Sequence, residues 1–273
     1  MAFYDLAGRA VKLLAAAVIF STMSLPLAAR AEQTVVPCDA PIDLLRFSQP
    51  LSKVARKLAA GAPITIVAIG SSSTAGAGAS SDAATYPSRL SADLKQLFPR
   101  NVVTVVNQGV NGEEVPDMLK RFDKAVIANQ PDLVLWQLGT NSLIRDHMSD
   151  RSGAMIREGL KMIRAIGADV VLIDPQYAPK VNAKPRAREM VDFISATAKQ
   201  EGISLFRRFD LMKRWAEVGR MPFSAFVAAD GLHLNDWSYA CMAKGLGVAI
   251  AEAAQRPVLS ARVAPQLEAD FAP

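Results

Sequence analysis

The sequence has 273 residues, a formal net charge of +5, two cysteines and two histidines, and 51% of its residues are hydrophobic. A structural zinc site needs about four Cys or His ligands, and a disulfide-rich scaffold needs several cysteine pairs, so these counts argue against both. Charged residues make up 21% of the chain, which argues against wholesale disorder. The length suits one domain, and any mechanism that needs a histidine must use His147 or His233.

Residues 1–31 have the layout of a secretory signal peptide. Arg9 and Lys12 precede an apolar run that begins at Leu13, and the segment ends in the small-x-small pattern of residues 29–31. We therefore expect cleavage and export to a periplasmic or extracellular compartment. The alternative is an uncleaved membrane anchor, but polar residues and a proline within the run weaken it as a spanning helix.

The remaining charge argues against a nucleic-acid partner. Removal of residues 1–31 would lower the net charge from +5 to +3, and the basic residues that remain are dispersed. We expect no nucleic-acid partner, and no stable membrane insertion once the signal peptide is cleaved. The oligomeric state is not visible in the sequence.

The two cysteines, Cys38 and Cys241, lie near opposite ends of the exported chain. In an oxidising compartment they could form one disulfide, which would contribute about 2–4 kcal/mol to stability. Two separate buried thiols are equally compatible with the sequence, because it does not show whether the two Cα atoms come within bonding reach.

From residue 63 the sequence alternates between strand and helix patterns. Short apolar runs rich in β-branched residues predict buried strands at 64–70, 102–107, 132–139, 169–174 and 203–208. Apolar residues at helical spacing predict helices within 41–60, from Tyr86 to 97, and at 114–128, 150–166, 185–201 and 235–254. Strands that are apolar on both faces and separated by helices indicate an α/β fold, a five-stranded parallel sheet in a three-layer α/β/α sandwich. We expect an N-terminal extension at 32–62, one domain at 63–256 and a tail at 257–273.

Functional residues of open parallel sheets lie at the carboxyl ends of the strands. The first three predicted strands end in GSSSTAGAG (70–78), NQGVNG (107–112) and GTNS (139–142). Each loop also has an ordinary interpretation: a glycine-rich turn or phosphate cradle, an Asn-Gly turn, and a helix cap, respectively. The first loop lacks the Gly-Lys-Ser/Thr ending of a Walker A motif.

The segment DGLHLN places Asp230 three residues before His233, in a loop that precedes the last helix. This spacing lets the carboxylate orient the imidazole, as in a hydrolytic triad. The alternative is a surface loop in which Asn235 caps the helix. The other histidine, His147, has polar neighbours and no carboxylate paired with it at a strand end, so we predict a solvated loop residue.

The order of these motifs resembles the SGNH (GDSL-type) hydrolase family, over about residues 63–250. The family's G-D-S-x-T-x-G loop matches Gly70 to Gly76, which implies that Ser72 is the nucleophile. Its second-block glycine matches Gly109, and its third-block asparagine matches Asn141. Its D-x-x-H pair matches Asp230 and His233. The resemblance implies the flavodoxin-like SGNH hydrolase fold.

Two residues depart from the family pattern. Ser71 stands where the family has the aspartate before the nucleophile, and Ser142 stands where it has the aspartate after the asparagine. Neither departure removes a reacting group, but both change the hydrogen bonding around Ser72 and Asn141. Three consecutive serines also leave Ser71 or Ser73 as the nucleophile if the alignment slips by one residue.

The resemblance implies an exported serine esterase with an Asp230–His233–Ser72 triad. The oxyanion hole would comprise the N–H groups of Ser72 and Gly109 and the amide of Asn141, and no metal or cofactor is required. Short acyl esters or O-acetyl esters of carbohydrates are the expected substrates. The alternatives are a lysophospholipase or thioesterase, an acyltransferase on longer acyl chains, and a non-catalytic protein of the same fold that binds a carbohydrate or phosphate ligand.

Overall fold

A computed structural model describes residues 38, 40–147 and 151–256 of the protein. The predicted signal peptide and the predicted C-terminal tail lie outside the described residues. Everything described below belongs to one compact unit that begins at Cys38.

The centre of this unit is a five-stranded parallel sheet, as the sequence predicts. Its strands are β1 (Ile64–Gly70), β2 (Val103–Gly109), β3 (Leu133–Gln137), β4 (Asp169–Ile173) and β5 (Ser204–Phe206), in the order β2-β1-β3-β4-β5. Every neighbouring pair is parallel. The register pairs Gly70 with Gly109 and Ile69 with Trp136, so β1, β2 and β3 end at nearly the same level.

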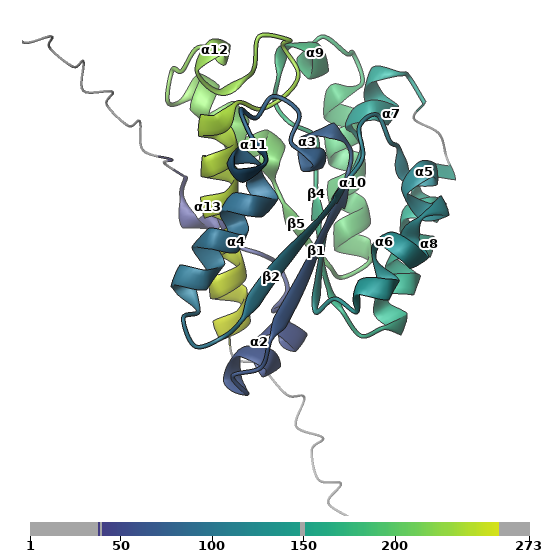
Figure 1. Ribbon diagram of the computed structural model, residues 1–273. Helices are drawn as coiled ribbons and strands as arrows, with labels where there is room; N and C mark the ends of the chain where they lie inside the picture. The colour runs from purple at the N-terminus through teal and green to yellow at the C-terminus, as the bar shows by residue number, and fades with distance from the viewer. Residues whose placement is uncertain (1–37, 39, 148–150, 257–273) are drawn as a thin grey trace, which may run out of the picture. The chain divides into compact units, whose positions relative to one another are not determined.

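Helices cover both faces of the sheet, and Figure 1 shows α4 and α13 on one side and α6, α8 and α10 on the other. The longer helices are α2 (Ser52–Ala59), α4 (Tyr86–Leu97), α8 (Arg151–Ala165), α10 (Ala187–Gln200), α11 (Arg208–Glu217) and α13 (Asp236–Gln255). The shorter helices are α1 (Ile42–Leu45), α3 (Ser72–Ala75), α5 (Val115–Lys120), α6 (Phe122–Ala125), α7 (Thr140–Ile144), α9 (Pro179–Asn182) and α12 (Phe223–Phe226), with 3₁₀ turns η1 (Asp82–Ala84) and η2 (Ile127–Asn129). The three-layer α/β/α prediction is confirmed.

The structure corrects several details of the predicted helices. The helix predicted at 114–128 is divided into α5, α6 and η2, because Arg121 leaves helical geometry with φ near −113°. The Arg121 guanidinium reaches back to Glu113 and to the carbonyl of Gln108, which holds this break. The helix predicted within 41–60 is two helices, and α11 was not predicted.

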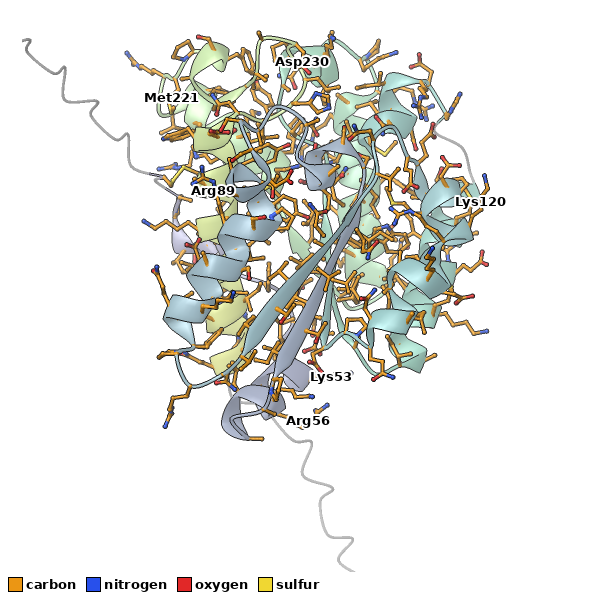
Figure 2. All side chains as sticks on the ribbon, in the orientation of Figure 1. Lys53, Arg56, Arg89, Lys120, Met221 and Asp230 are labelled. Carbon is orange, nitrogen blue, oxygen red and sulfur yellow. A yellow bond between two sulfur atoms is a disulfide. The ribbon has the colours of Figure 1, made fainter. Side chains whose placement is uncertain are left out.

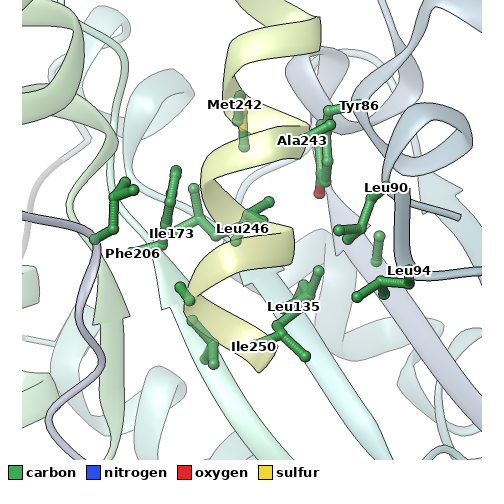
Figure 3. Close-up of a cluster of buried hydrophobic side chains, with 14 of the residues drawn as sticks. Tyr86, Leu90, Leu94, Leu135, Ile173, Phe206, Met242, Ala243, Leu246 and Ile250 are labelled. Carbon is green, nitrogen blue, oxygen red and sulfur yellow. The ribbon is translucent and has the colours of Figure 1, made fainter. Parts of the chain in front are cut away.

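Alternate residues of each strand supply the two hydrophobic cores. In β1, the side chains of Ile64 and Ile66 join the core beneath α4 and α13, while Val67 and Ile69 join the core beneath α5, α8 and α10. Figure 3 shows α13 lying in the first of these cores, where its buried side chains meet side chains from the sheet and from α4: Tyr86, Leu90, Leu94, Leu135, Ile173, Phe206, Leu246 and Ile250. Fully burying a side chain of this size contributes about 1.5–3 kcal/mol, so these contacts fix α13 firmly on the sheet.

One disulfide joins Cys38 to Cys241, across 203 positions of sequence, with Cα atoms 5.2 Å apart. The structure therefore has the bridge that the sequence left open. Cys241 is buried within α13, and the bridge ties the segment before α1 to that helix. Within the described parts of the chain, no helix combines the length and the apolar character needed to cross a membrane.

We predict that Cys38→Ser lowers the free energy of unfolding by about 2–4 kcal/mol, because the unfolded chain would regain the freedom that a long covalent loop removes. Urea denaturation of the oxidised wild type and of the variant measures the difference. Reductant should destabilise the wild type by a similar amount and leave the variant unchanged. Equal unfolding midpoints for the oxidised wild type and the variant would contradict this prediction.

Candidate active site

The loops that carry the predicted functional residues gather at one end of the sheet. Figure 1 shows α3, α7, α9 and α12 at the end where the strands finish, and α2 at the opposite end. Figure 2 places Asp230 at the same end as α12, and Lys53 and Arg56 at the end near α2. This arrangement agrees with the rule that ligands of open parallel sheets bind beyond the carboxyl ends of the strands.

Ser72 is the first residue of α3, directly after β1. Ser71 precedes it in an extended conformation and acts as the N-cap residue, while Gly76 ends the helix with φ near +106°, a conformation that favours glycine. The first N–H groups of a helix have no partner within it. Accordingly, the Ser72 N–H donates to no atom of the described residues.

Gln137, at the end of β3 and only 1% exposed, anchors this turn. Its Oε1 atom accepts hydrogen bonds from the Ser71 N–H (2.9 Å) and the Ser71 hydroxyl (3.0 Å), and lies 3.4 Å from the Thr74 hydroxyl oxygen. Ser71 therefore has a buried polar partner in Gln137, although the serine side chain is shorter than the aspartate that the SGNH family has at this position. Sequence reasoning missed Gln137, because a single glutamine in an apolar strand carries no spacing signal.

The imidazole of His233 lies between Ser72 and Asp230. Its Nε2 atom is 2.8 Å from the Ser72 hydroxyl oxygen, and its Nδ1 atom contacts a carboxylate oxygen of Asp230. The other Asp230 oxygen accepts the N–H groups of Leu232 (2.9 Å) and His233 (3.0 Å). Although partial burial would raise the pKa of Asp230, these hydrogen bonds lower it to about 2, so the carboxylate is ionised at neutral pH.

Of the three consecutive serines, Ser72 contacts the imidazole, whereas the other two do not. Ser71 donates to Gln137, and the buried hydroxyl of Ser73 has no partner among the described residues. The geometry therefore agrees with the alignment that implies Ser72.

Backbone contacts fix the histidine loop on its neighbours. The Ala228 N–H donates to the His233 carbonyl (2.8 Å), and the Lys180 N–H donates to the Gly231 carbonyl (3.0 Å). Asn235 caps α13 by accepting the Ser238 N–H (3.1 Å). The capping interpretation of Asn235 is thus correct, and it is compatible with the contact between His233 and Ser72.

Gly109 lies at the end of β2, against the backbone of α3. A Cβ atom at this position would lie 2.0 Å from the Ala75 nitrogen, so only glycine permits the approach. The Gly109 N–H already donates to the side-chain oxygen of Asn107 (2.9 Å). It could therefore serve an oxyanion only after Asn107 turned away.

Asn141 lies in the first turn of α7, and its side-chain amide donates to the Glu113 carbonyl (2.9 Å). One of its two amide hydrogens thus fixes the side chain, which leaves the other available. Gly112, which directly precedes Glu113, has φ near +79°, and its N–H donates to no atom of the described residues. Gly112 is therefore a second candidate donor in the loop after β2, one that the sequence analysis did not single out.

His147 has a carboxylate partner that its neighbours in sequence do not reveal. Its Nδ1 atom lies 3.0 Å from Oε1 of Glu114, which also accepts from Arg145 (2.8 Å), while Oε2 of Glu114 accepts from the Ser142 hydroxyl (2.9 Å). Although burial alone would raise the pKa of Glu114, these hydrogen bonds lower it below the ordinary value. The His147 side chain is 60% exposed and has no contact with Ser72, which agrees with its prediction as a solvated loop residue.

A hydroxyl, an imidazole and an ionised carboxylate in hydrogen-bonded sequence can perform acyl transfer through a serine nucleophile. Among the residues that the structure describes, no cluster of three or more His, Cys, Asp or Glu side chains is placed to hold a metal ion.

Comparison with known proteins gives a consistent picture. An acetylxylan esterase from Geobacillus stearothermophilus is 26% identical over 152 residues, which cover 51% of this chain and 68% of the relative. A solved catalytic mutant of an acetylxylan esterase from the same organism superposes with a TM-score of 0.57 at 18% identity, over 71% of this chain and 95% of the other. A two-domain esterase active on acetylated mannans, crystallised with mannopentaose, superposes with a TM-score of 0.65 at 17% identity.

That last match covers 78% of this chain but only 56% of the two-domain esterase, so this chain spans little more than half its length. At these identities the solved structures support the fold alone. The sequence pattern of the Non-GDSL lipase-like family matches residues 37–256, a range that includes every described residue. The chain therefore belongs to the Non-GDSL lipase-like family, and the resemblance to SGNH-type hydrolases is confirmed.

Proposed function

We propose that this protein is a serine esterase that removes O-acetyl groups from carbohydrates. The observation that carries the proposal is the hydrogen-bonded series from the Ser72 hydroxyl through the His233 imidazole to the Asp230 carboxylate. A serine hydroxyl is a weak nucleophile at neutral pH, and a base within hydrogen-bond distance is what activates it.

In the first half of the reaction, His233 Nε2 takes the proton of the Ser72 hydroxyl as its oxygen attacks the acetyl carbonyl carbon. The tetrahedral intermediate collapses when the bond to the sugar oxygen breaks, and His233 returns the proton to that oxygen. Water then attacks the acetyl-enzyme by the same path, releasing acetate and restoring Ser72. Asp230 keeps the imidazole oriented and stabilises its charged form.

The negative oxygen of the tetrahedral intermediate requires N–H donors that are already in place. The unpartnered Ser72 N–H and the fixed amide of Asn141 are our candidates, together with an N–H from the loop after β2. Gly109, the last residue of β2, remains the predicted donor, and Gly112 in the loop that follows is the alternative, because its N–H has no partner among the described residues. Loss of one such donor costs on the order of 10²–10³ in rate in known enzymes.

The relatives support the choice of substrate. The relatives described above are acetylxylan esterases and an esterase active on acetylated mannans, which share acetylated polysaccharides as substrates. The signal-like pattern of residues 1–31 and the disulfide between Cys38 and Cys241 support export to the compartment where such polysaccharides occur.

We predict that the wild type releases acetate from acetylated xylo-oligosaccharides or manno-oligosaccharides and that Ser72→Ala does not, because no other hydroxyl of the described residues hydrogen-bonds to the His233 imidazole. Acetate release measures activity, and a fluorophosphonate probe should label Ser72 in the wild type but nothing in the variant. Ser73→Ala is the matched control and should keep both properties. Activity on lysophospholipids or long-chain thioesters without acetate release would exclude the acetyl-ester substrate while keeping the nucleophile.

We also predict that His233→Ala abolishes acetate release whereas His147→Ala keeps it within about twofold, because only His233 reaches the nucleophile. Both variants change a histidine whose Nδ1 contacts a carboxylate, so they form a matched pair. Initial rates at saturating substrate provide the measurement, and circular dichroism checks the fold. An inactive His147→Ala beside an active His233→Ala would overturn the assignment of the base.

A further inference from the structure

A buried side-chain amide connects the loop that carries the proposed base, His233, to the segment at the start of α7 that carries Asn141, called the Asn141 loop below. Gln176 follows β4 and is only 1% exposed. Its Oε1 atom accepts the Thr140 hydroxyl (2.9 Å), and its Nε2 atom donates to the Leu232 carbonyl (3.1 Å). Thr140 directly precedes Asn141, and Leu232 directly precedes His233. The Gln176 side chain thus contacts the residue directly before Asn141 and the residue directly before His233.

The chemistry of the partners fixes the orientation of this amide. Oε1 of Gln176 also accepts from Nη2 of Arg208 (3.0 Å), and a guanidinium can only donate. The Leu232 carbonyl can only accept, so Nε2 must face it. Rotating the amide by 180° would set N–H groups against the guanidinium and an oxygen against the carbonyl. Arg208 therefore determines which end of Gln176 meets each loop.

Arg208 is itself fully buried, in the first turn of α11. Its Nε atom donates to the Asp174 carbonyl (2.9 Å), and the Asp174 carboxylate accepts the N–H of Phe209 (2.9 Å). Burial lowers the pKa of Arg208 to about 10, so the guanidinium remains charged at neutral pH. Hydrogen bonds from a charged donor are stronger than neutral ones, so Gln176 is held firmly. A buried ion adds little net stability, because the loss of its hydration offsets the interactions that it gains. A positional role therefore explains this arginine better than a stabilising role does.

We propose that Gln176 is a positioning residue, which sets the distance between the His233 loop and the Asn141 loop, and that Arg208 holds it in the working orientation. This inference rests on the function proposed above for Ser72, His233 and Asn141. The separation of the base from the oxyanion donor matters, because a misplacement of about 1 Å costs on the order of 10²-fold in rate.

Gln176→Met tests the proposal, since methionine has nearly the same shape but makes none of the three hydrogen bonds. We expect acetate release per active site to fall on the order of 10²-fold in kcat, with KM little changed. Fluorophosphonate labelling of Ser72 counts the competent sites, so a loss of folded protein does not mimic the effect. Thr140→Val removes one of the three bonds and should lower kcat per site on the order of tenfold.

Thr197→Val is the matched control. Thr197 is also buried, and its hydroxyl donates to the Phe193 carbonyl within α10 (2.8 Å), so this substitution has the same chemistry away from the two loops. Its kcat per labelled site should equal that of the wild type.

Wild-type kcat per labelled site in both Gln176→Met and Thr140→Val would overturn the proposal. If Gln176→Met does not fold, the proposal is decided by kcat per labelled site in Thr140→Val compared with that in Thr197→Val. Failure of the proposed function gives a different result: the wild type would not be labelled at Ser72, or Ser72→Ala would still release acetate.

Discussion

The hydrogen bond between the His233 imidazole and the Ser72 hydroxyl joins two segments that are 161 residues apart in sequence. The length of this hydrogen bond depends on how the turn that carries Ser72 and the loop that carries His233 lie relative to each other, and no covalent bond joins these two segments directly. The parallel sheet brings them to the same end, because Ser72 begins α3 just beyond the end of β1, and α13, which packs across the sheet, begins at Asp236, shortly after His233. The disulfide to Cys241 and the apolar contacts of α13 then stabilise the helix that carries the histidine loop at its start.

Much of this arrangement could be predicted from the sequence, because the motif residues lie directly after the apolar runs that predict the strands, or directly before the pattern of the last helix. The runs that form β1, β3 and β4 are largely apolar on both faces, so the three-layer fold and the edge that carries the site follow from the pattern. Ser72 and the Asp230–His233 pair were predicted from their motifs, and the structure places the three in contact. His147 shows the limit, because its carboxylate partner Glu114 lies 33 positions away in another loop.

The residues that the sequence did not reveal are buried polar side chains with long-range partners. Gln137 lies in a strand whose other residues are apolar, and Gln176 lies in the loop after β4; both are buried. The helix α11 was missed because it opens on the charged Arg208, which the fold buries completely. Local patterns assign such residues to the surface, since only tertiary partners offset the cost of burying them.

The proposed reacting groups and the side chains that hold them come from different parts of the fold. Ser72 lies in the turn that begins the short helix α3, and His233 lies in the loop before α13. Such connecting turns and loops are the more mobile parts of a domain. The buried amides Gln137 and Gln176 lie on or beside β3 and β4, and each hydrogen-bonds one of these loops to the rigid sheet. This division explains how the chain can lack the family's aspartate at Ser71. Gln137 accepts hydrogen bonds from the Ser71 backbone as well as from its hydroxyl, so the position of Ser72 depends on the neighbouring strand more than on the side chain of the residue before it.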